Sequence, residues 1–327
     1  MEAHSLFLND AGRLRSGWRL GIFTIVLIAV LFVISSLVRV VFAIALLANG
    51  HARLAPYFAD IIFRTILLAS ALVAGWICNR WLEGLPWRAL GLTFHSKWLR
   101  DFVVGSLIGV ASLALAVLIA IAAGRLRFAL TREMFLGVLQ RLLSTLVLFI
   151  VAALFEESLF RGYPLQTVTR AGLAWFGILI TSVVPFAAGH LENPHLTVFS
   201  LINTAFAGVW LAIAYLRTRS LWFPLGVHWA WNWAQGSIFG LAVSGVVVSA
   251  HQVFQATDNG PAWLTGGTYG IEGGVACTIA LLLSILFIWR TRLVSATAEL
   301  KRLTSQENPR QKSNTLLQTN DGDSPRD

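Results

Sequence analysis

The sequence predicts an all-α polytopic membrane protein with about eight transmembrane helices. Hydrophobic residues make up 56% of the 327 residues, without counting the 27 glycines, and only 13% are charged. Soluble domains have ~45–50% apolar and ~25% charged residues. This composition excludes a water-soluble globule and a chain that is disordered throughout. Cys78 and Cys277 both stand in apolar runs, which excludes a disulfide framework and a Cys-rich zinc site.

The apolar stretches set the number of predicted spans. A helix rises 1.5 Å per residue, so about 20 apolar residues are needed to cross ~30 Å of hydrocarbon. The first stretch is too long for the apolar region of a signal peptide, and we expect it to be retained. Loop breakers such as Pro56 and Asn193-Pro194 separate the stretches. The predicted spans are residues 20–48, 57–78, 102–124, 142–163, 174–190, 198–215, 221–247 and 271–289.

The distribution of basic residues predicts the orientation. The net charge is +9, but Lys and Arg flank the spans instead of forming a stripe, so we expect the lipid bilayer and no nucleic acid as a partner. With the N-terminus inside, 18 of the 25 Lys and Arg residues fall in inner segments, 5 in outer segments and 2 within spans. Both termini are therefore predicted to be cytoplasmic. Four of the five outer residues lie in one loop, which argues against this orientation. The outer residues are Arg53, Arg125, Arg127, Arg132 and Arg141.

These patterns predict three regions. Residues 1–19 are expected to form a cytoplasmic segment, residues 20–290 a transmembrane helical domain, and residues 291–327 a polar, disordered cytoplasmic tail.

Two adjacent carboxylates end the fourth predicted span, in the run Glu156-Glu157-Ser-Leu-Phe-Arg161. Ionisable groups at membrane depth cost at least ~2.5–3.5 kcal/mol, so each is a candidate functional residue. At 100° per residue, Glu157 and Arg161 share a helix face and can pair, whereas Glu156 points about 100° away. We therefore expect Glu157 to be neutralised and Glu156 to be free for proton transfer. An interfacial helix end whose carboxylates reach water is the alternative.

Two histidines each stand one helical turn from another candidate residue. His190 stands one turn after Phe186, and His228 stands one turn before Asn232 inside the seventh predicted span. Because an unsatisfied polar group in hydrocarbon costs several kcal/mol, His228 and Asn232 predict a shared polar cavity. The alternatives are a satisfied histidine at a helix end and polar packing between helices.

In this order, the three runs resemble the motifs EExxxR, FxxxH and HxxxN/D of the CPBP family of intramembrane proteases, which includes the CAAX prenyl-protein endopeptidases and the Abi bacteriocin-processing or immunity proteins. The resemblance covers residues 142–235. It implies an intramembrane endopeptidase of a bacterial plasma membrane that acts on membrane-associated protein or peptide substrates.

The resemblance also implies roles for the residues. Glu156 and His190 would activate water, His228 and Asn232 would stabilise the oxyanion, and Glu157 and Arg161 would support the glutamate turn. Glu156, His190 and His228 could instead be ligands of Zn²⁺, and the sequence does not choose between a zinc and a metal-free glutamate mechanism, although the HExxH pattern of zincins is absent.

Two other classes of function remain open, a transporter-type membrane protein and a non-catalytic membrane scaffold or immunity protein. Substrate identity and oligomeric state stay undetermined. One geometric problem also remains, because hydropathy places His190 at the outer end of its span, away from Glu156. We expect residues 162–172 to form an interfacial or re-entrant piece that leaves His190 deeper in the membrane.

Overall fold

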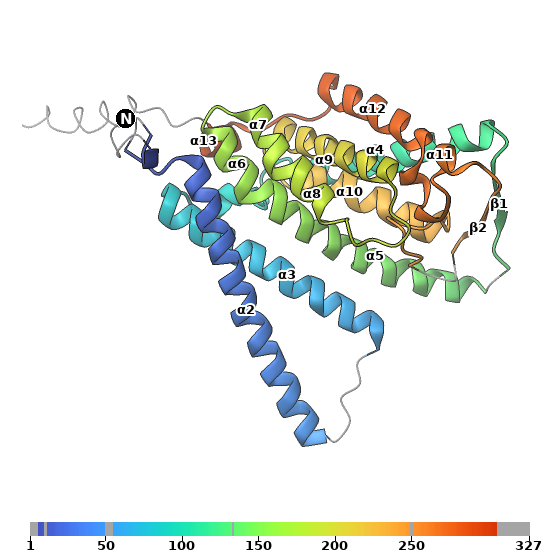
Figure 1. Cartoon of the computed structure of the whole chain (residues 1–327), viewed down its shortest axis with the longest axis horizontal. Coiled ribbons are helices and arrows are strands. Elements are labelled where there is room, and N and C mark those ends of the chain that lie inside the picture. Colours follow the sequence, from blue (N-terminus) through green and yellow to red (C-terminus); the bar gives the residue numbers. More distant parts are fainter. Residues whose placement is uncertain (1–5, 10–11, 50–54, 133, 249–251, 306–327) are drawn as a thin grey trace, which may run out of the picture.

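The computed structural model describes residues 6–9, 12–49, 55–132, 134–248 and 252–305, and these residues are mostly helical (Figure 1). One short antiparallel pair of strands joins β1 to β2, with Phe128 opposite Ala256. The strands are β1 (Leu126–Leu130) and β2 (Phe254–Asp258). The α-helices are α2 (Ser16–Asn49), α3 (Pro56–Cys78), α4 (Trp98–Ala122), α5 (Phe135–Glu157), α6 (Tyr163–Arg170), α7 (Ala174–Ile178), α8 (Val184–Ala188), α9 (Val198–Thr218), α10 (Trp222–Trp233), α11 (Ala262–Thr265), α12 (Val275–Arg290) and α13 (Ala298–Thr304).

The membrane-protein prediction is confirmed in its coarse form, and the count of eight spans is not. Among the described residues, five helices are long and apolar enough to cross a membrane. They match the first, second, third, fourth and sixth predicted spans. They are Ser16–Leu47, Pro56–Glu83, Trp98–Ala122, Phe135–Arg170 and Val198–Thr218.

The other three predicted spans are helices that end early. The fifth is Ala174–Ala188 and the eighth is Val275–Arg290, both shorter than a full span. The seventh stops at Ile238 and continues as irregular chain toward Val247. The apolar composition of α10 has another cause, because this helix is surrounded by protein and buries nearly every residue from Phe223 to Trp231. A helix that is hydrophobic all round is buried, and hydropathy does not tell burial in protein from burial in lipid.

Helix α10 occupies the centre of the helical bundle, against α4, α5 and α9 (Figure 1). Its approach to α4 is so close that a Cβ at Gly226 would overlap the carbonyl oxygen of Phe102, and one at Gly105 would overlap that of Phe223. Small residues allow helix backbones to approach in this way within membranes. The main core therefore forms around α10 and contains Trp210, Phe223 and Trp231.

The fourth predicted span continues beyond its expected end. Helix α5, a π-helical segment (Ser158–Gly162) and α6 form one unbroken helical unit, Phe135–Arg170. Most of residues 162–172 is helical, since α6 runs through Arg170 and all of its residues are buried. Whether this piece is interfacial or re-entrant stays a prediction. Arg161, assigned to an inner loop by the charge pattern, is likewise fully buried inside this unit. Pro164 does not end the helix because it stands in the first turn of α6, where its missing N–H is not needed.

A buried ion network ties the start of α2 to the ends of α3 and α6. The Glu83 carboxylate lies 2.8 Å from Arg19 Nη1 and 3.2 Å from Arg170 Nη2. It also accepts a hydrogen bond of 2.9 Å from Thr167 Oγ1. All three charged side chains are buried. This network is the main polar link between α2, which otherwise diverges from the bundle in Figure 1, and the rest of the protein.

Several residues of the predicted inner segments lie at this same end of the molecule. Arg88 pairs with Glu299 of α13, and Lys97 donates a hydrogen bond to Ser295. The start of α2 and the last described helix therefore share one end, as an even number of crossings requires (Figure 1). Which side of the membrane this end faces stays a prediction. Arg53 lies outside the described residues.

The expected disordered tail of residues 291–327 is in part a short helix. Thr297 caps α13 by accepting from the Leu300 backbone N–H, and Leu300 is buried. The polar composition of this segment did not predict the helix, because a short helix needs only one buried apolar side chain to pack against the protein. Residues 306–327 lie outside the described residues.

We predict that Glu83→Gln lowers the free energy of unfolding by about 3–5 kcal/mol, because it removes the carboxylate that pairs with the buried Arg170 guanidinium and also contacts Arg19. The matched control is Glu299→Gln, whose pair with Arg88 at 3.3 Å is largely exposed and contributes at most about 1 kcal/mol. Unfolding of both purified variants in detergent measures the difference. Equal melting temperatures would contradict a stabilising role for the network.

Candidate active site

The two glutamates at the end of α5 point in different directions. Glu157 is fully buried and its Oε1 lies 3.0 Å from Arg161 Nη1, with both side chains inaccessible to solvent. Arg161 also donates to the carbonyl oxygen of Gly208 at 3.4 Å, and its guanidinium carbon lies 4.6 Å from the centre of the Phe186 ring. Glu156 points instead toward the cavity described below and keeps 20% of its side chain exposed. This division follows the 100° helical offset between neighbouring residues.

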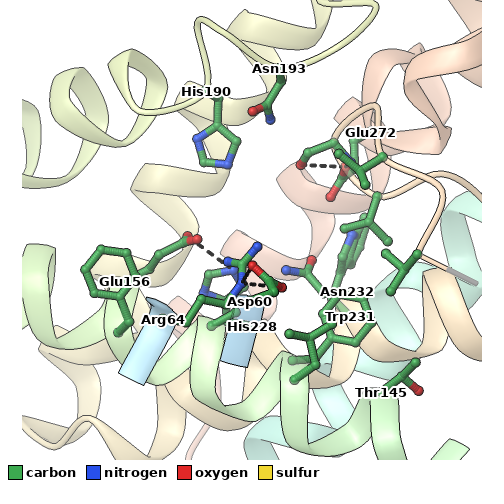
Figure 2. Close-up of a pocket in the computed structure, with 18 of the residues that line it drawn as sticks. Asp60, Arg64, Thr145, Glu156, His190, Asn193, His228, Trp231, Asn232 and Glu272 are labelled. Carbon is green, nitrogen blue, oxygen red and sulfur yellow. Dashed lines mark hydrogen bonds and ion pairs between the residues drawn. The ribbon is translucent and has the colours of Figure 1, made fainter. Parts of the chain in front are cut away.

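His228 of α10 lies between these two carboxylates. Its Nδ1 is 2.9 Å from Glu157 Oε1 and its Nε2 is 3.7 Å from Glu156 Oε2 (Figure 2). Glu157 therefore has two partners, Arg161 and His228, whereas the helical spacing had indicated only the first. The Nδ1 contact turns the other ring nitrogen toward Glu156.

His190 stands in the turn that follows α8. Its Nδ1–H donates to the carbonyl oxygen of Phe186 at 2.7 Å, and its ring packs on the Phe186 ring at 4.9 Å between centres. The imidazole points into the cavity between Glu156 and Asn193 (Figure 2). The unit from Ala174 to Ala188 rises only about 22 Å, so His190 stops short of the ~30 Å that a full span would cover. His190 nevertheless lines the same cavity as Glu156.

One cavity of about 970 Å³ collects the four candidate catalytic residues. Glu156, His190, His228 and Asn232 all line it, from α5, the turn after α8, and α10. Glu157 and Arg161 are not among the residues that line the cavity and lie behind its wall. The sequence patterns thus converge in space, with one set of polar groups facing the cavity and another set holding it in place.

The same cavity tests whether the candidate residues fit a metal ion. In the part of the chain that the structure describes, no group of three His, Cys, Asp or Glu residues lies close enough to hold one. Glu156 and His228 face each other, but His190 does not complete a three-ligand set with them. As placed, these residues do not fit the expected Zn²⁺ site.

Other polar residues of the cavity were not singled out in the sequence. They include Asn193 beside His190, Asn203 and Thr204 of α9, Ser244 of the loop after α10, and Glu272 just before α12. Gln140, Arg141, Ser144 and Thr145 of α5 and Tyr57 of α3 also line the cavity. Glu272 did carry a signal, since it is an ionisable residue at the start of an apolar stretch and stands among glycines. Asp60 and Arg64 also line the cavity and pair at 3.0 Å.

We predict that Arg161→Ala destabilises the protein by about 3–5 kcal/mol, because it leaves the buried Glu157 without its guanidinium. Glu156→Gln, which replaces a partly exposed carboxylate without a Lys or Arg partner among the described residues, should leave the melting temperature unchanged or raise it. Thermal unfolding of the two purified variants tests the contrast. If Arg161→Ala melts like the unmodified protein, the ion pair does not support the fold.

The comparisons with known proteins agree with the site. Residues 138–234 match the family described as Rce1-like, type II CAAX prenyl endopeptidase Rce1-like. The match includes all three motifs and nearly coincides with the resemblance expected at residues 142–235. No curated protein matches the chain. The match at residues 138–234 supports assignment of the chain to the CPBP/CAAX protease family, and with it a peptidase.

Proposed function

We propose that the chain is an intramembrane endopeptidase that hydrolyses peptide bonds of membrane-associated proteins or peptides. The observation that carries this proposal is the convergence of Glu156, His190, His228 and Asn232 on one cavity among apolar helices. The family is named for prenylated CAAX proteins. Here the proposed substrate class is membrane-associated chains in general, whether prenylated or not.

Glu156 is the proposed general base. Its Oε2 is buried and accepts no hydrogen bond from the described residues, so it is available to a water molecule. Glu156 takes a proton from this water, and the water oxygen adds to the carbonyl carbon of the substrate. When the tetrahedral intermediate collapses, the C–N bond breaks and Glu156 returns the proton to the leaving amine. His190 assists this proton transfer through Nε2, because its Nδ1–H already donates to the carbonyl oxygen of Phe186.

His228 and Asn232 are the proposed oxyanion partners. The Glu157 contact at Nδ1 directs Nε2 of His228 toward the cavity, where a protonated Nε2 can donate to the developing oxyanion. Asn232 lies one turn further along α10 and its amide can donate to the same oxygen (Figure 2). Donors that are fixed before the reaction stabilise the oxyanion most effectively.

We predict that Glu156→Gln and His228→Ala each lower the rate of proteolysis by about 10²–10⁴-fold while the protein stays folded. Comparative peptidomics of cells with the unmodified protein and with Glu156→Gln identifies a substrate, which is then used with purified protein. The control is His195→Asn, because His195 is an exposed histidine with φ 59°, a conformation that Asn tolerates.

The double variant should lose no more activity than the more impaired single variant, because residues that act as one catalytic unit have non-additive effects. Multiplied losses would indicate separate roles for Glu156 and His228. Full activity in either single variant would remove that residue from the mechanism and would favour the scaffold or transporter alternative.

We also expect proteolysis to survive removal of divalent metal ions by a chelator, because no group of three His, Cys, Asp or Glu residues among the described residues lies close enough to hold one. Activity is measured before and after dialysis against the chelator and after addition of Zn²⁺. Loss of activity that Zn²⁺ alone restores would show that His190 moves to complete a metal site.

A further inference from the structure

The cavity has a second polar wall that lies outside the family match. After residue 234 the chain returns to the cavity and places Glu272 there, across from Glu156 (Figure 2). Glu272 Oε2 accepts hydrogen bonds from the Ser244 backbone N–H at 2.6 Å and from Ser244 Oγ at 3.0 Å. The Glu272 carbonyl oxygen accepts from Asn203 Nδ2 at 2.7 Å. Hydrogen bonds therefore hold both the side-chain carboxylate and the backbone carbonyl of Glu272.

The surrounding loops are in close backbone contact at glycines. Gly270 has φ 98°, and a Cβ there would overlap the carbonyl oxygen of Ala242. Gly245 has φ 86°, and a Cβ there would overlap that of Pro194. Only glycine fits either position. These contacts join the glycine-rich segment that carries Glu272 to the loop of Ser244 and to the turn that carries Asn193.

The two hydrogen bonds from Ser244 do not require Glu272 to be charged. An uncharged amide oxygen could accept both hydrogen bonds from Ser244, so holding the loop does not explain a carboxylate. Of the three acids that line the cavity, Asp60 pairs with Arg64 and Glu156 faces His228. Among the described residues, Glu272 has no Lys, Arg or His nitrogen within ion-pair distance. His190 lies near enough for a favourable electrostatic interaction with this carboxylate but forms no ion pair with it. An enclosed carboxylate without an ion-pair partner marks a place for a cation.

We propose that Glu272 and Asn193 form a subsite for a cationic side chain of the substrate, the ammonium of a Lys or the guanidinium of an Arg. The Glu272 oxygen that Ser244 does not use would accept one N–H. In Figure 2 the amide nitrogen of Asn193 lies on the side of Glu272, so the amide would turn over to let its oxygen accept another. The subsite deepens the proposed function and rests on it. A basic residue held here would position the neighbouring peptide bond toward Glu156.

The first test uses the full chain in lipid nanodiscs and a positional library of fluorogenic peptides that carry Lys, Arg, norleucine or Glu at each position. We expect the unmodified protein to favour Lys or Arg over norleucine at one position by at least about tenfold in kcat/KM. Glu272→Gln should bring this ratio close to one. Asn193→Asp, which adds a second carboxylate to the subsite, should raise it.

The matched control is Glu192→Gln, which removes the same charge from an exposed acid next to Asn193 that does not line the cavity. This variant should keep the ratio of the unmodified protein. If the ratio changes as much in Glu192→Gln as in Glu272→Gln, the preference reflects general charge and the subsite is wrong.

A binding measurement separates the subsite from the proposed proteolysis. Fluorescence polarisation compares the Lys and norleucine pools on Glu156→Gln and on Glu156→Gln/Glu272→Gln. Tighter binding of the Lys pool that is lost only in the double variant supports the subsite, even if no peptide is ever cleaved. Equal binding of both pools, or a Lys preference that survives Glu272→Gln, would overturn it. If Glu272→Gln does not fold, the preference of Asn193→Asp for Lys or Arg over norleucine decides alone. An unchanged or lower preference in Asn193→Asp would then overturn the proposal.

Discussion

The buried carboxylate of Glu157 is the interaction on which the rest of the site depends. One of its oxygens contacts both the Arg161 guanidinium and the His228 imidazole, so a single charge joins α5, the π-helical segment after it, and α10. Arg161 extends the link to α9 through the Gly208 carbonyl. Because an uncompensated charge inside a membrane protein is costly, the Arg161 pair stabilises this arrangement of helices, and the His228 contact orients the imidazole within it.

Helical geometry explains why two adjacent glutamates have different surroundings. One residue of offset rotates a side chain by 100°, which is enough for Glu157 to face a neighbouring helix while Glu156 faces the cavity. The same local rule made part of the site predictable from sequence. The Glu157–Arg161 pair, the separation of Glu156, and the shared face of His228 and Asn232 all depend on spacings within one or two turns of one helix.

Features that depend on distant parts of the chain were not predictable in this way. The contact between Glu157 and His228 joins residues 71 positions apart, and no periodicity encodes it. Helix α10 was read as a full span because protein and lipid surroundings favour the same apolar side chains. The place of His190 in the cavity depends on how distant helices pack, which hydropathy does not encode. Glu272 was overlooked because its glycine-rich surroundings match no catalytic pattern, although its charge in an apolar stretch was visible.

The short helices and the cavity have a common cause. Close packing of α4 and α10 through glycine places α10 at the centre of the bundle, where neighbouring helices cover it. A covered helix does not need to span the bilayer, so α10 ends at depth and the chain returns as loops that line a cavity, which membranes tolerate only inside protein. The matched segment supplies the reactive groups on one wall, and the chain after it supplies the other. Residues 138–234 can therefore retain one chemistry while the loops around Ser244 and Glu272 vary what the cavity accepts, because the two walls are built from separate parts of the sequence.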